Sequence, residues 1–228
     1  KNVTMQRLFD ILFSSFALLV FSPLLLPIVF ILRVTGEGKI FFLQERIGYR
    51  SRSFKLYKFA TMLENSPNMG TGTVTLTDDP RILPFGRLLR KTKINELPQL
   101  INIFLGDMSV IGPRPQTQRC FDAFPEQSQH VIVQVRPGLS GVGSIVFRNE
   151  DELMDGQADP DHFYDKVIMP YKGRLEEWYV QNQSLGWYFV LIATTMWIVL
   201  CPQSNIVRAI FSSKLPLPPD GLEGKLCI

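Results

Sequence analysis

Histidine and cysteine are scarce in this chain. Its 228 residues include two histidines, His130 and His162, and three cysteines, Cys120, Cys201 and Cys227. The cysteines lack the spacing of a zinc site and cannot form a disulfide framework, as is typical of proteins in a reducing compartment. Chemistry based on histidine or zinc is therefore a poor explanation for what this protein does.

Several common ligand-binding and catalytic signatures are absent as well. The sequence contains no G-x-G-x-x-G, no Walker A motif, no G-x-S-x-G and no H-E-x-x-H. A net charge of only +3 argues against a dedicated nucleic-acid binder, and a hydrophobic content of 46% excludes a disordered chain. The composition fits one globular domain, or at most two.

Charged residues are missing from a long stretch near the N-terminus. The run from Ile11 to Leu32 has none, which is enough for the roughly 20 apolar residues of a membrane-spanning helix. A signal peptide is the less favoured alternative, because its apolar region is usually about 7–15 residues long and no small-residue cleavage site follows. Ser22-Pro23 in the middle predicts a kink, with the Ser22 hydroxyl bonding a carbonyl freed by the proline. On physical grounds alone, a kinked spanning helix and a helix that re-enters on the same face remain equally open.

A second stretch without charge runs from Ser184 to Pro202 and contains Trp187, Tyr188 and Trp197. It is compatible with a short spanning helix, an interfacial helix or a buried helix. Tryptophan and tyrosine favour membrane interfaces, so contact with a membrane is the preferred interpretation.

Charge is concentrated in blocks elsewhere in the chain. Segments 33–60 and 81–93 are basic, whereas segment 149–177 is acidic. A basic surface beside an apolar anchor suits anionic lipid headgroups and also a phosphorylated substrate. The same arrangement places the polar part on the cytoplasmic side of a membrane.

The residue pattern predicts an α+β fold that is mostly α. Short strands at 39–43 and 54–59 flank a turn, and helical spacing follows over 95–105 and 121–135. There are too few strands for a doubly wound sheet. We expect an anchor over 1–35, a main domain over 36–202 that ends in the apolar helix, and a C-terminal tail over 203–228.

The strongest candidate for chemistry is the segment around Asn95-Glu96. Three cations, Arg90, Lys91 and Lys93, precede this pair at the head of an apolar helix. Such cations attract phosphate, and a carboxylate there can hold Mg²⁺ or attack phosphorus. The alternative is plain capping, with Asn95 as the N-cap, and spacing alone favours the alternative.

Two further sites offer a cation at a defined position. Arg114, in Gly112-Pro113-Arg114-Pro115, sits on a backbone that proline stiffens on both sides, which suits phosphate binding although a purely structural turn is more common. Lys58 at the end of a strand is a weaker candidate.

Taken together, these segments resemble the monotopic phosphoglycosyl transferases, also called bacterial sugar transferases. The resemblance covers roughly residues 5 to 200 and rests on motifs in a fixed order. They are the anchor with Ser22-Pro23, Gln44–Gly48, Phe54–Met62, Asp79–Ile82, Leu89–Thr92, Glu96–Leu100, Gly106–Pro115 and Arg136–Gly141.

The resemblance implies a bacterial enzyme of the cytoplasmic membrane whose catalytic domain faces the cytoplasm. Such enzymes move a sugar 1-phosphate from a UDP-sugar to undecaprenyl phosphate with Mg²⁺, through a covalent phosphosugar-enzyme intermediate. In this family an Asp-Glu pair is catalytic and metal-binding, which points to Asn95 and Glu96 here. Lys58, Arg90, Arg114 and Pro115 match the phosphate or substrate site. The resemblance also implies that Ser22-Pro23 makes a re-entrant helix-break-helix.

The sequence departs from the family pattern at the catalytic Asp, where Asn95 stands. An amide is a poor nucleophile and a weak Mg²⁺ ligand. Three explanations stay open: an engineered Asp→Asn form, a natural variant in which Glu96 takes over, and an inactive relative. Two other hypotheses therefore stay open: a membrane-docked nucleotide-sugar binder without turnover, and a small spanning protein with no ligand. Nucleic acid is not an expected partner, and an oligomer is allowed. The sugar is not readable from the sequence, although segments 65–77 and 146–152 are candidates for selecting it.

Overall fold

The computed structural model describes residues 2–66, 79–154, 159–211, 213–222, 224 and 226. The chain forms two compact units. Unit 1 consists of Lys1–Asp10, Arg46–Phe54 and Gly106–Ile228, and unit 2 consists of Ile11–Glu45 and Lys55–Leu105. Residues 67–77, most of the first segment considered for sugar selection, lie outside the described residues. The expected boundaries at 35 and 202 stay a prediction.

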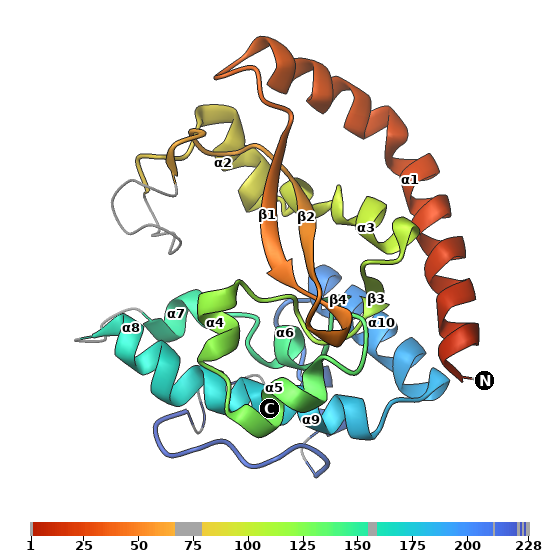
Figure 1. Cartoon of the computed structure of the whole chain (residues 1–228), viewed down its shortest axis with the longest axis vertical. Coiled ribbons are helices and arrows are strands. Elements are labelled where there is room, and N and C mark those ends of the chain that lie inside the picture. Colours follow the sequence, from red (N-terminus) through yellow and green to blue (C-terminus); the bar gives the residue numbers. More distant parts are fainter. Residues whose placement is uncertain are drawn as a thin grey trace. The chain divides into compact units, whose positions relative to one another are not determined.

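The N-terminal helix α1 runs without interruption from Asn2 to Val34, through Pro23 and Pro27 (Figure 1). The expected break at Ser22-Pro23 is therefore not a break in the helix. Proline at position 23 cannot donate to the carbonyl of Leu19, four residues earlier. Instead the Ser22 hydroxyl donates to that oxygen at 2.7 Å, as expected. The side chain replaces the missing backbone donor and lets the helix continue.

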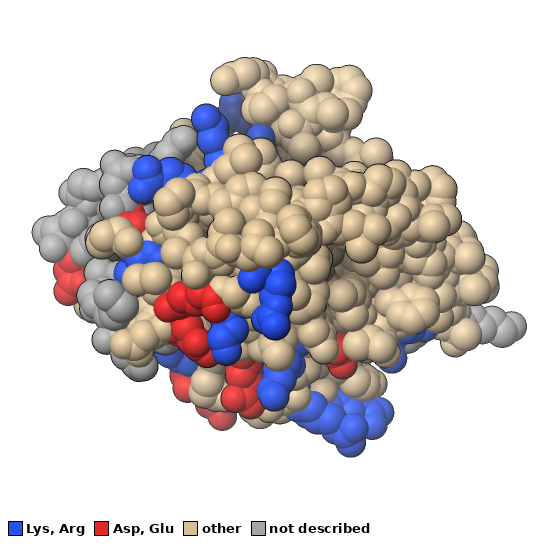
Figure 2. All heavy atoms as spheres, turned by 90° about the horizontal axis from the view of Figure 1, so that it is seen from above, with Lys and Arg blue, Asp and Glu red and all other residues tan. Residues whose placement is uncertain are grey.

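The side chains of α1 reverse the pattern of a water-soluble helix. Gln6, Asp10 and Ser14 are buried, at 8%, 2% and 0% exposure, whereas Phe16 and Leu19 are 67% and 73% exposed. Among the described residues, α1 is the one helix long and apolar enough to cross a membrane, judged by length and composition. A large part of the surface in Figure 2 likewise carries no charged side chain.

Unit 2 contains the base of a β-hairpin, whose tip over 46–54 belongs to unit 1, and three short helical elements. Strands β1 (Phe41–Ile47) and β2 (Ser53–Phe59) pair as a two-stranded sheet, close to the expected positions. Helix α2 (Pro84–Lys91), a 3₁₀ turn η3 (Ile94–Glu96) and helix α3 (Gln99–Leu105) follow. The core of this unit is formed by Ile28, Leu32, Phe59 and Leu89.

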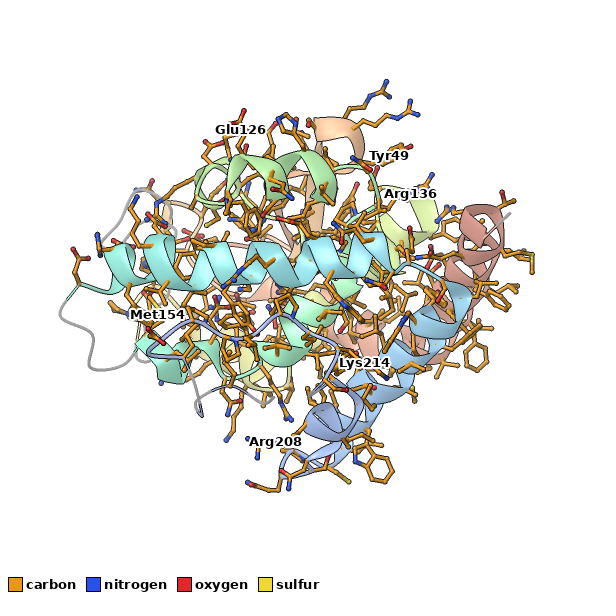
Figure 3. The ribbon with its side chains drawn as sticks, turned by 90° about the horizontal axis from the view of Figure 1, so that it is seen from below. Tyr49, Glu126, Arg136, Met154, Arg208 and Lys214 are labelled. Carbon is orange, nitrogen blue, oxygen red and sulfur yellow. The ribbon has the colours of Figure 1, made fainter. Side chains whose placement is uncertain are left out.

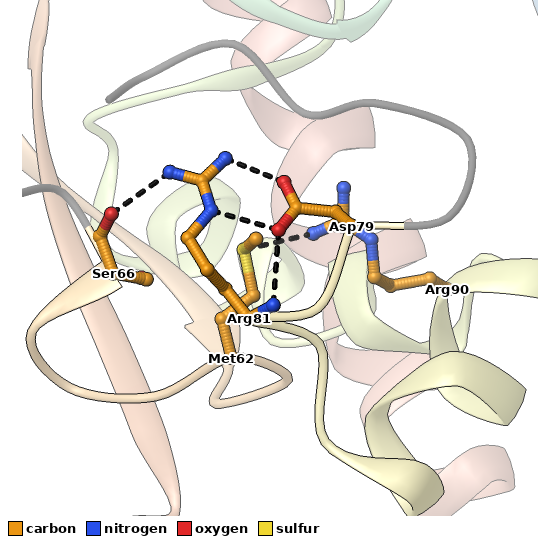
Figure 4. A network of polar contacts seen from close by, with 5 residues as sticks. All are labelled: Met62, Ser66, Asp79, Arg81 and Arg90. Atoms are coloured by element: carbon orange, nitrogen blue, oxygen red, sulfur yellow. Dashed lines mark hydrogen bonds and ion pairs between the residues drawn. The ribbon is translucent and has the colours of Figure 1, made fainter. Parts of the chain in front are cut away.

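The start of α2 is held by a buried ion pair and a close backbone contact. The Arg81 guanidinium donates two hydrogen bonds to the Asp79 carboxylate and a third, at 2.9 Å, to the carbonyl of Ser66, and the Arg81 amide also donates to Asp79 (Figure 4). Gly86 lies so close to Thr61 that a Cβ at position 86 would overlap the Thr61 backbone. The 61–66 segment and α2 are therefore locked together.

Unit 1 is mostly helical and contains one short parallel sheet. Strands β3 (Ser109–Ile111) and β4 (Gly138–Ser140) pair with Ser109 opposite Gly138 and Ile111 opposite Ser140. The helical elements are α4 (Gln118–Asp122), α5 (Glu126–Ile132), α6 (Val142–Val146), α7 (Glu150–Met154), α8 (Pro160–Phe163), a π-helical turn (Tyr164–Ile168), α9 (Met169–Gln181), α10 (Leu185–Leu200) and α11 (Ile206–Phe211). The expected α+β, mostly α composition is confirmed, while the helix expected over 121–135 is divided at Pro125 into α4 and α5.

Helix α10 is packed on one face and exposed on the other. Tyr188, Leu191, Thr194 and Ile198 recur at helical spacing and are buried in the core of unit 1. The opposite face exposes apolar side chains, among them Leu200 at 76% exposure. Of the three alternatives for segment 184–202, a fully buried helix does not fit this exposure, and the spanning and interfacial helices stay predictions.

The contact of Gly86 with Thr61 predicts a large effect of a single methyl group. We expect Gly86→Ala to lower the free energy of unfolding by about 1–3 kcal/mol, since the added Cβ forces the backbones apart. The matched control is Gly186→Ala in α10, where Ser184 Oγ, at 3.8 Å, is the nearest side-chain atom to a new Cβ. There alanine should leave stability unchanged or raise it by up to about 1 kcal/mol. Thermal unfolding of the detergent-solubilised chain measures both, and equal midpoints for the two variants would contradict the close contact.

Candidate functional site

Four of the residues singled out from the sequence belong to unit 2. They are Lys58 near the end of β2, Arg90 in the last turn of α2, and Asn95 and Glu96 in η3. Arg114 and Pro115 belong to unit 1, in the turn that follows β3. The two groups are each built by local interactions within their own unit.

A left-handed residue sets the path of the chain into Asn95. Lys93 has φ 58°, uncommon for a residue with a side chain, and is followed by the single 3₁₀ turn Ile94–Glu96. The next helix starts only at Gln99. The helix expected over 95–105 is therefore four residues too long at its N-terminus, because a 3₁₀ turn over Ile94–Glu96 and then Pro98 precede the α-helix.

The Asn95 side chain is buried and its acceptor atom is unused. Its relative exposure is 7%, and Oδ1 has no hydrogen-bond partner. The N-cap position of η3 is Lys93, without a side-chain hydrogen bond, so capping by Asn95 is wrong. A buried acceptor left without a donor costs about 1–3 kcal/mol, which is tolerated mainly where function requires it. Gln99 adds a second such atom, since its Nε2 is buried and unbonded.

Glu96 is the carboxylate of this cluster and lies near a cation. Its Oε1 is 3.8 Å from Nζ of Lys58, and the side chains are 21% and 19% exposed. Both remain accessible to a ligand while constrained by the surrounding protein. A cation beside a carboxylate can contact the anionic oxygens of a phosphate that approaches that carboxylate.

Asn102 fixes the strand that carries Lys58. This side chain is fully buried; its Nδ2 donates to the Lys55 carbonyl at 2.8 Å, and its Oδ1 accepts from the Tyr57 amide at 2.9 Å. One carboxamide thus satisfies both edge groups of β2 and joins α3 to the strand. The sequence motifs did not identify Asn102, and its helical spacing from Asn95 was the available signal.

Arg90 is held at the end of α2. Its Nη1 lies 3.6 Å from the sulfur of Met62 (Figure 4). Met62 belongs to the 61–66 segment, which packs against the start of α2. The position is therefore defined by the same contacts that fix the start of α2.

The turn that carries Arg114 and Pro115 is bonded to its neighbours on several sides. The Gly112 amide donates to the Ser140 carbonyl at 2.9 Å, and the Gly138 amide donates to the Pro113 carbonyl at 2.8 Å. Arg46 Nη1 donates to the Pro115 carbonyl at 3.1 Å. A small pocket lies beside the turn, lined by Arg114 and Pro115 together with apolar residues such as Phe121, Phe124 and Ile132. Near it, Arg136 packs over the ring of Tyr49 (Figure 3).

Asn95 and Glu96 together could hold one divalent cation. The unbonded Oδ1 of Asn95 and the carboxylate of Glu96 are oxygen ligands, which Mg²⁺ prefers, and this ion commonly takes only one or two carboxylates plus substrate phosphates. Within the described part of the chain, no group of three or more His, Cys, Asp or Glu residues is arranged to hold a metal. The residues present therefore fit a cation shared with a phosphorylated ligand better than a closed metal site.

Comparison with known proteins gives a consistent result. The model of the bacterial sugar transferase family matches residues 1–202. The chain is 37% identical over 205 residues to the exopolysaccharide production protein ExoY of Rhizobium meliloti (strain 1021), covering 84% of this chain and 83% of that protein.

Two relatives carry names that state a reaction. The chain is 34% identical over 189 residues to the UDP-N-acetylgalactosamine-undecaprenyl-phosphate N-acetylgalactosaminephosphotransferase of Aeromonas hydrophila, covering 82% of this chain and 41% of that protein. It is 34% identical over 159 residues to the UDP-glucose:undecaprenyl-phosphate glucose-1-phosphate transferase of Klebsiella pneumoniae, covering 68% of this chain and 34% of that protein. The chain thus spans less than half the length of these two relatives.

The two buried asparagines of unit 2 predict opposite effects on stability. We expect Asn95→Leu to leave the thermal midpoint unchanged or raise it, since the variant removes a buried acceptor without a partner. Asn102→Leu should lower the free energy of unfolding by about 2–4 kcal/mol, because it leaves the Lys55 carbonyl and the Tyr57 amide unsatisfied. Thermal unfolding of the two variants side by side measures the difference. A clear loss of stability in Asn95→Leu would contradict the unused acceptor.

Proposed function

The chain belongs to the bacterial sugar transferase family, and from this premise we propose that it transfers a sugar 1-phosphate from a UDP-sugar to undecaprenyl phosphate. The observation that carries the proposal is the buried, unbonded Oδ1 of Asn95 beside the Glu96 carboxylate, at the position of the family's catalytic pair. Its relatives are named for undecaprenyl-phosphate sugar phosphotransfer or for exopolysaccharide production, which supports a role at the membrane step that starts a glycan.

Cations are distributed to bind a diphosphate. Lys58 lies beside the Glu96 carboxylate, Arg90 ends α2, and Arg114 leaves a turn fixed by backbone hydrogen bonds. Guanidinium groups bind phosphate oxygens through two parallel hydrogen bonds, and lysine contributes a compact charge. In the proposed complex Lys58 and Arg90, which belong to unit 2 with Glu96, bind the diphosphate and orient the β-phosphorus toward Glu96. Arg114 of unit 1 stays a predicted phosphate-binding cation.

Glu96 is the nucleophile that this chain offers in place of the family Asp. Its carboxylate oxygen forms a bond to the β-phosphorus while the bond to the bridging oxygen breaks, so UMP leaves with that oxygen and its electron pair. An oxygen of undecaprenyl phosphate then attacks the same phosphorus and releases the Glu96 carboxylate. The lipid diphosphate sugar is the product, and no oxidant or further reactant is required.

Asn95 and Glu96 are the residues that would hold Mg²⁺. When bound, the ion offsets the negative charge of the diphosphate and of the departing UMP. Asn95 contributes a neutral oxygen where a carboxylate would contribute a charge, so we propose weaker Mg²⁺ binding than the Asp-Glu pair provides.

The amide side chain of Asn95 also favours a second function. With an amide at position 95, the chain is suited to bind a UDP-sugar without turnover, as a membrane-docked member of a glycan assembly complex. Binding and turnover separate the two functions experimentally, because binding needs the cations while turnover needs a nucleophile.

We also propose that α1 enters and leaves the membrane on one face. Its first residues bond within unit 1, where Gln6 donates to Ser109 at 2.9 Å, and its last residues pack in unit 2, where Ile28 and Leu32 are buried. Segment 35–60, which connects the two units, has no apolar run long enough to cross a bilayer. The first residues of α1 are thus tied to unit 1 and its last residues to unit 2. The basic residues that follow α1 favour the cytoplasmic face, and the exposed side of α10 is suited to lie at the interface.

The transferase proposal predicts release of UMP. Full-length chain, Mg²⁺, undecaprenyl phosphate and a panel of UDP-sugars should yield UMP slowly, and Asn95→Asp should accelerate release by at least about 100-fold, in line with the cost of losing a catalytic nucleophile. Glu96→Gln should abolish release by the unmodified chain, with Glu177→Gln as a control outside the site. Mass spectrometry should find a phosphosugar on Glu96.

Three outcomes decide between the functions. Binding of a UDP-sugar with no UMP, together with turnover in Asn95→Asp, would favour the non-catalytic binder. Turnover that persists in Glu96→Gln would exclude Glu96 as nucleophile. Silence of both the unmodified chain and Asn95→Asp across the panel would refute the transferase.

The topology proposal predicts labelling from one side only. In a background of Cys120→Ser, Cys201→Ser and Cys227→Ser, single cysteines at exposed Thr4 and Val34 flank the apolar run. In sealed inside-out vesicles both should react with an impermeant maleimide, and in right-side-out vesicles neither should. Opposite accessibility of the two positions would establish a helix that spans the membrane.

A further inference from the structure

We propose that Glu176 is a positioning residue for Arg114. Its buried carboxylate accepts hydrogen bonds from the backbone amides of Arg114 and Gly143, and so fixes the turn from which the Arg114 guanidinium reaches an anionic ligand. The identity of that ligand, the diphosphate of a UDP-sugar, rests on the proposed function. The contact between Glu176 and the turn does not.

The location of Glu176 is unusual for an acidic side chain. It projects from α9 into the core of unit 1 and is 2% exposed. Burying a carboxyl group is costly unless it is hydrogen-bonded, so a residue of this type in a core signals a specific partner. The partners here are two backbone amides from different segments of the chain, and one of them belongs to Arg114.

Two neighbouring glycines leave space for this carboxylate. A Cβ at Gly143 would overlap Oε1 of Glu176, and a Cβ at Gly141 would lie 3.7 Å from Oε2. Neither glycine has a positive φ, so space and not backbone conformation explains the absence of a side chain at Gly143.

The Arg114 amide is the donor through which Glu176 can act. Pro113 and Pro115 have no N–H group, so Arg114 supplies the one backbone donor of this tripeptide. On the other side of the turn, Gly112 and Pro113 are bonded to β4 through Ser140 and Gly138. Glu176 therefore adds a partner for the Arg114 amide to a turn that β4 and Arg46 also bond.

The groups that face Glu176 tune its charge. Lys172, one turn earlier on α9, and Arg114 favour the ionised form, while Tyr179 lies near it on the same helix. Lys172 is itself bonded to both carboxylate oxygens of Glu150, at 2.8 Å each. Burial dominates and raises the pKa of Glu176 to about 7. Oε2 has no hydrogen-bond partner and is the oxygen that can take the proton without displacing an amide.

Ionisation should therefore affect both the ligand site and stability near neutral pH. The carboxylate accepts stronger hydrogen bonds than the neutral acid, so the turn is held more firmly as pH rises through about 7. Stability changes in the opposite direction. The unfolded carboxyl ionises near 4.5 and the buried one near 7, so the contribution of Glu176 to folding is lost as pH rises between these values.

Hydrogen exchange of the full-length chain in detergent tests the contact directly. Peptides that differ by Pro113-Arg114-Pro115 report a single backbone amide, that of Arg114. We expect Glu176→Leu to accelerate its exchange at least about tenfold, whereas Glu176→Gln, which keeps an acceptor oxygen, should retain most of the protection. Glu177→Gln is the matched control, because Glu177 is adjacent on α9 and contacts Ser128 instead. Unchanged exchange at Arg114 in Glu176→Leu would overturn the proposal.

Affinity for UDP-glucose, whose phosphates do not titrate near neutral pH, tests the positioning role. Glu176→Leu should weaken binding about tenfold, and the effect should vanish in an Arg114→Gln background if Glu176 acts through Arg114. The affinity of the unmodified chain should rise between pH 6 and 8, whereas Glu176→Gln should be flat and Glu177→Gln should behave like the unmodified chain. A pH dependence of affinity that persists in Glu176→Gln would overturn the positioning role. So would a loss of affinity from Glu176→Leu that is equally large in the Arg114→Gln background. If Glu176→Leu does not fold, Glu176→Gln decides the question. If the unmodified chain binds none of a panel of UDP-sugars, the proposed function fails, while the exchange measurement still decides the contact.

Discussion

Strand β2 has an edge with two backbone groups that need partners, the Lys55 carbonyl and the Tyr57 amide, and one carboxamide supplies both. Because Asn102 bonds the two groups at once, it fixes α3 along the strand and in register with it. Lys58 is the next residue on the strand, and Glu96 lies at the entrance to the helix. The separation of 3.8 Å between their charged atoms is thus a consequence of this contact, since an ion pair at this distance and exposure is too weak to define the geometry by itself.

Buried polar groups in unit 2 fall into two classes with different meanings. Asn102 is completely satisfied and contributes to stability, whereas Asn95 and Gln99 each keep a buried atom without a partner. Proteins retain such atoms mainly where a ligand completes the hydrogen bonding. Glu176 in unit 1 represents an intermediate case, because one oxygen faces two amides and the other has none. Ser144, Asp165 and Ser204 also keep such atoms, so only those of Asn95, Gln99 and Glu176 belong to the proposed site or support it.

Local patterns predicted the elements better than they predicted the site. The hairpin followed from alternating apolar residues around Gly48–Ser53, and the bond from Ser22 to the Leu19 carbonyl followed from the geometry of proline. The start of α3 was misplaced because residues 94–96 form a 3₁₀ turn, which the spacing of apolar residues does not distinguish from an α-helix. Asn102 and Glu176 went unrecognised for another reason. Their partners lie 45 and 47 residues away for Asn102, and in a separate turn for Glu176, and such pairings arise only from tertiary packing.

The stability of helix α1 depends on the solvent that surrounds it. In water, a helix gains stability by burying apolar side chains and exposing polar ones. Here Gln6, Asp10 and Ser14 are buried while Phe16 and Leu19 are exposed. In water this arrangement would cost free energy, because apolar surface stays in contact with the solvent. The pattern is stable if the outer face meets hydrocarbon and the polar face meets protein donors and acceptors, as Asp10 does with Ser109 and Tyr188. The same reasoning explains α10, whose apolar residues cover both the protein core and an exposed face. In the proposed function, helices of this kind would keep the phosphotransfer site close to the lipid phosphate.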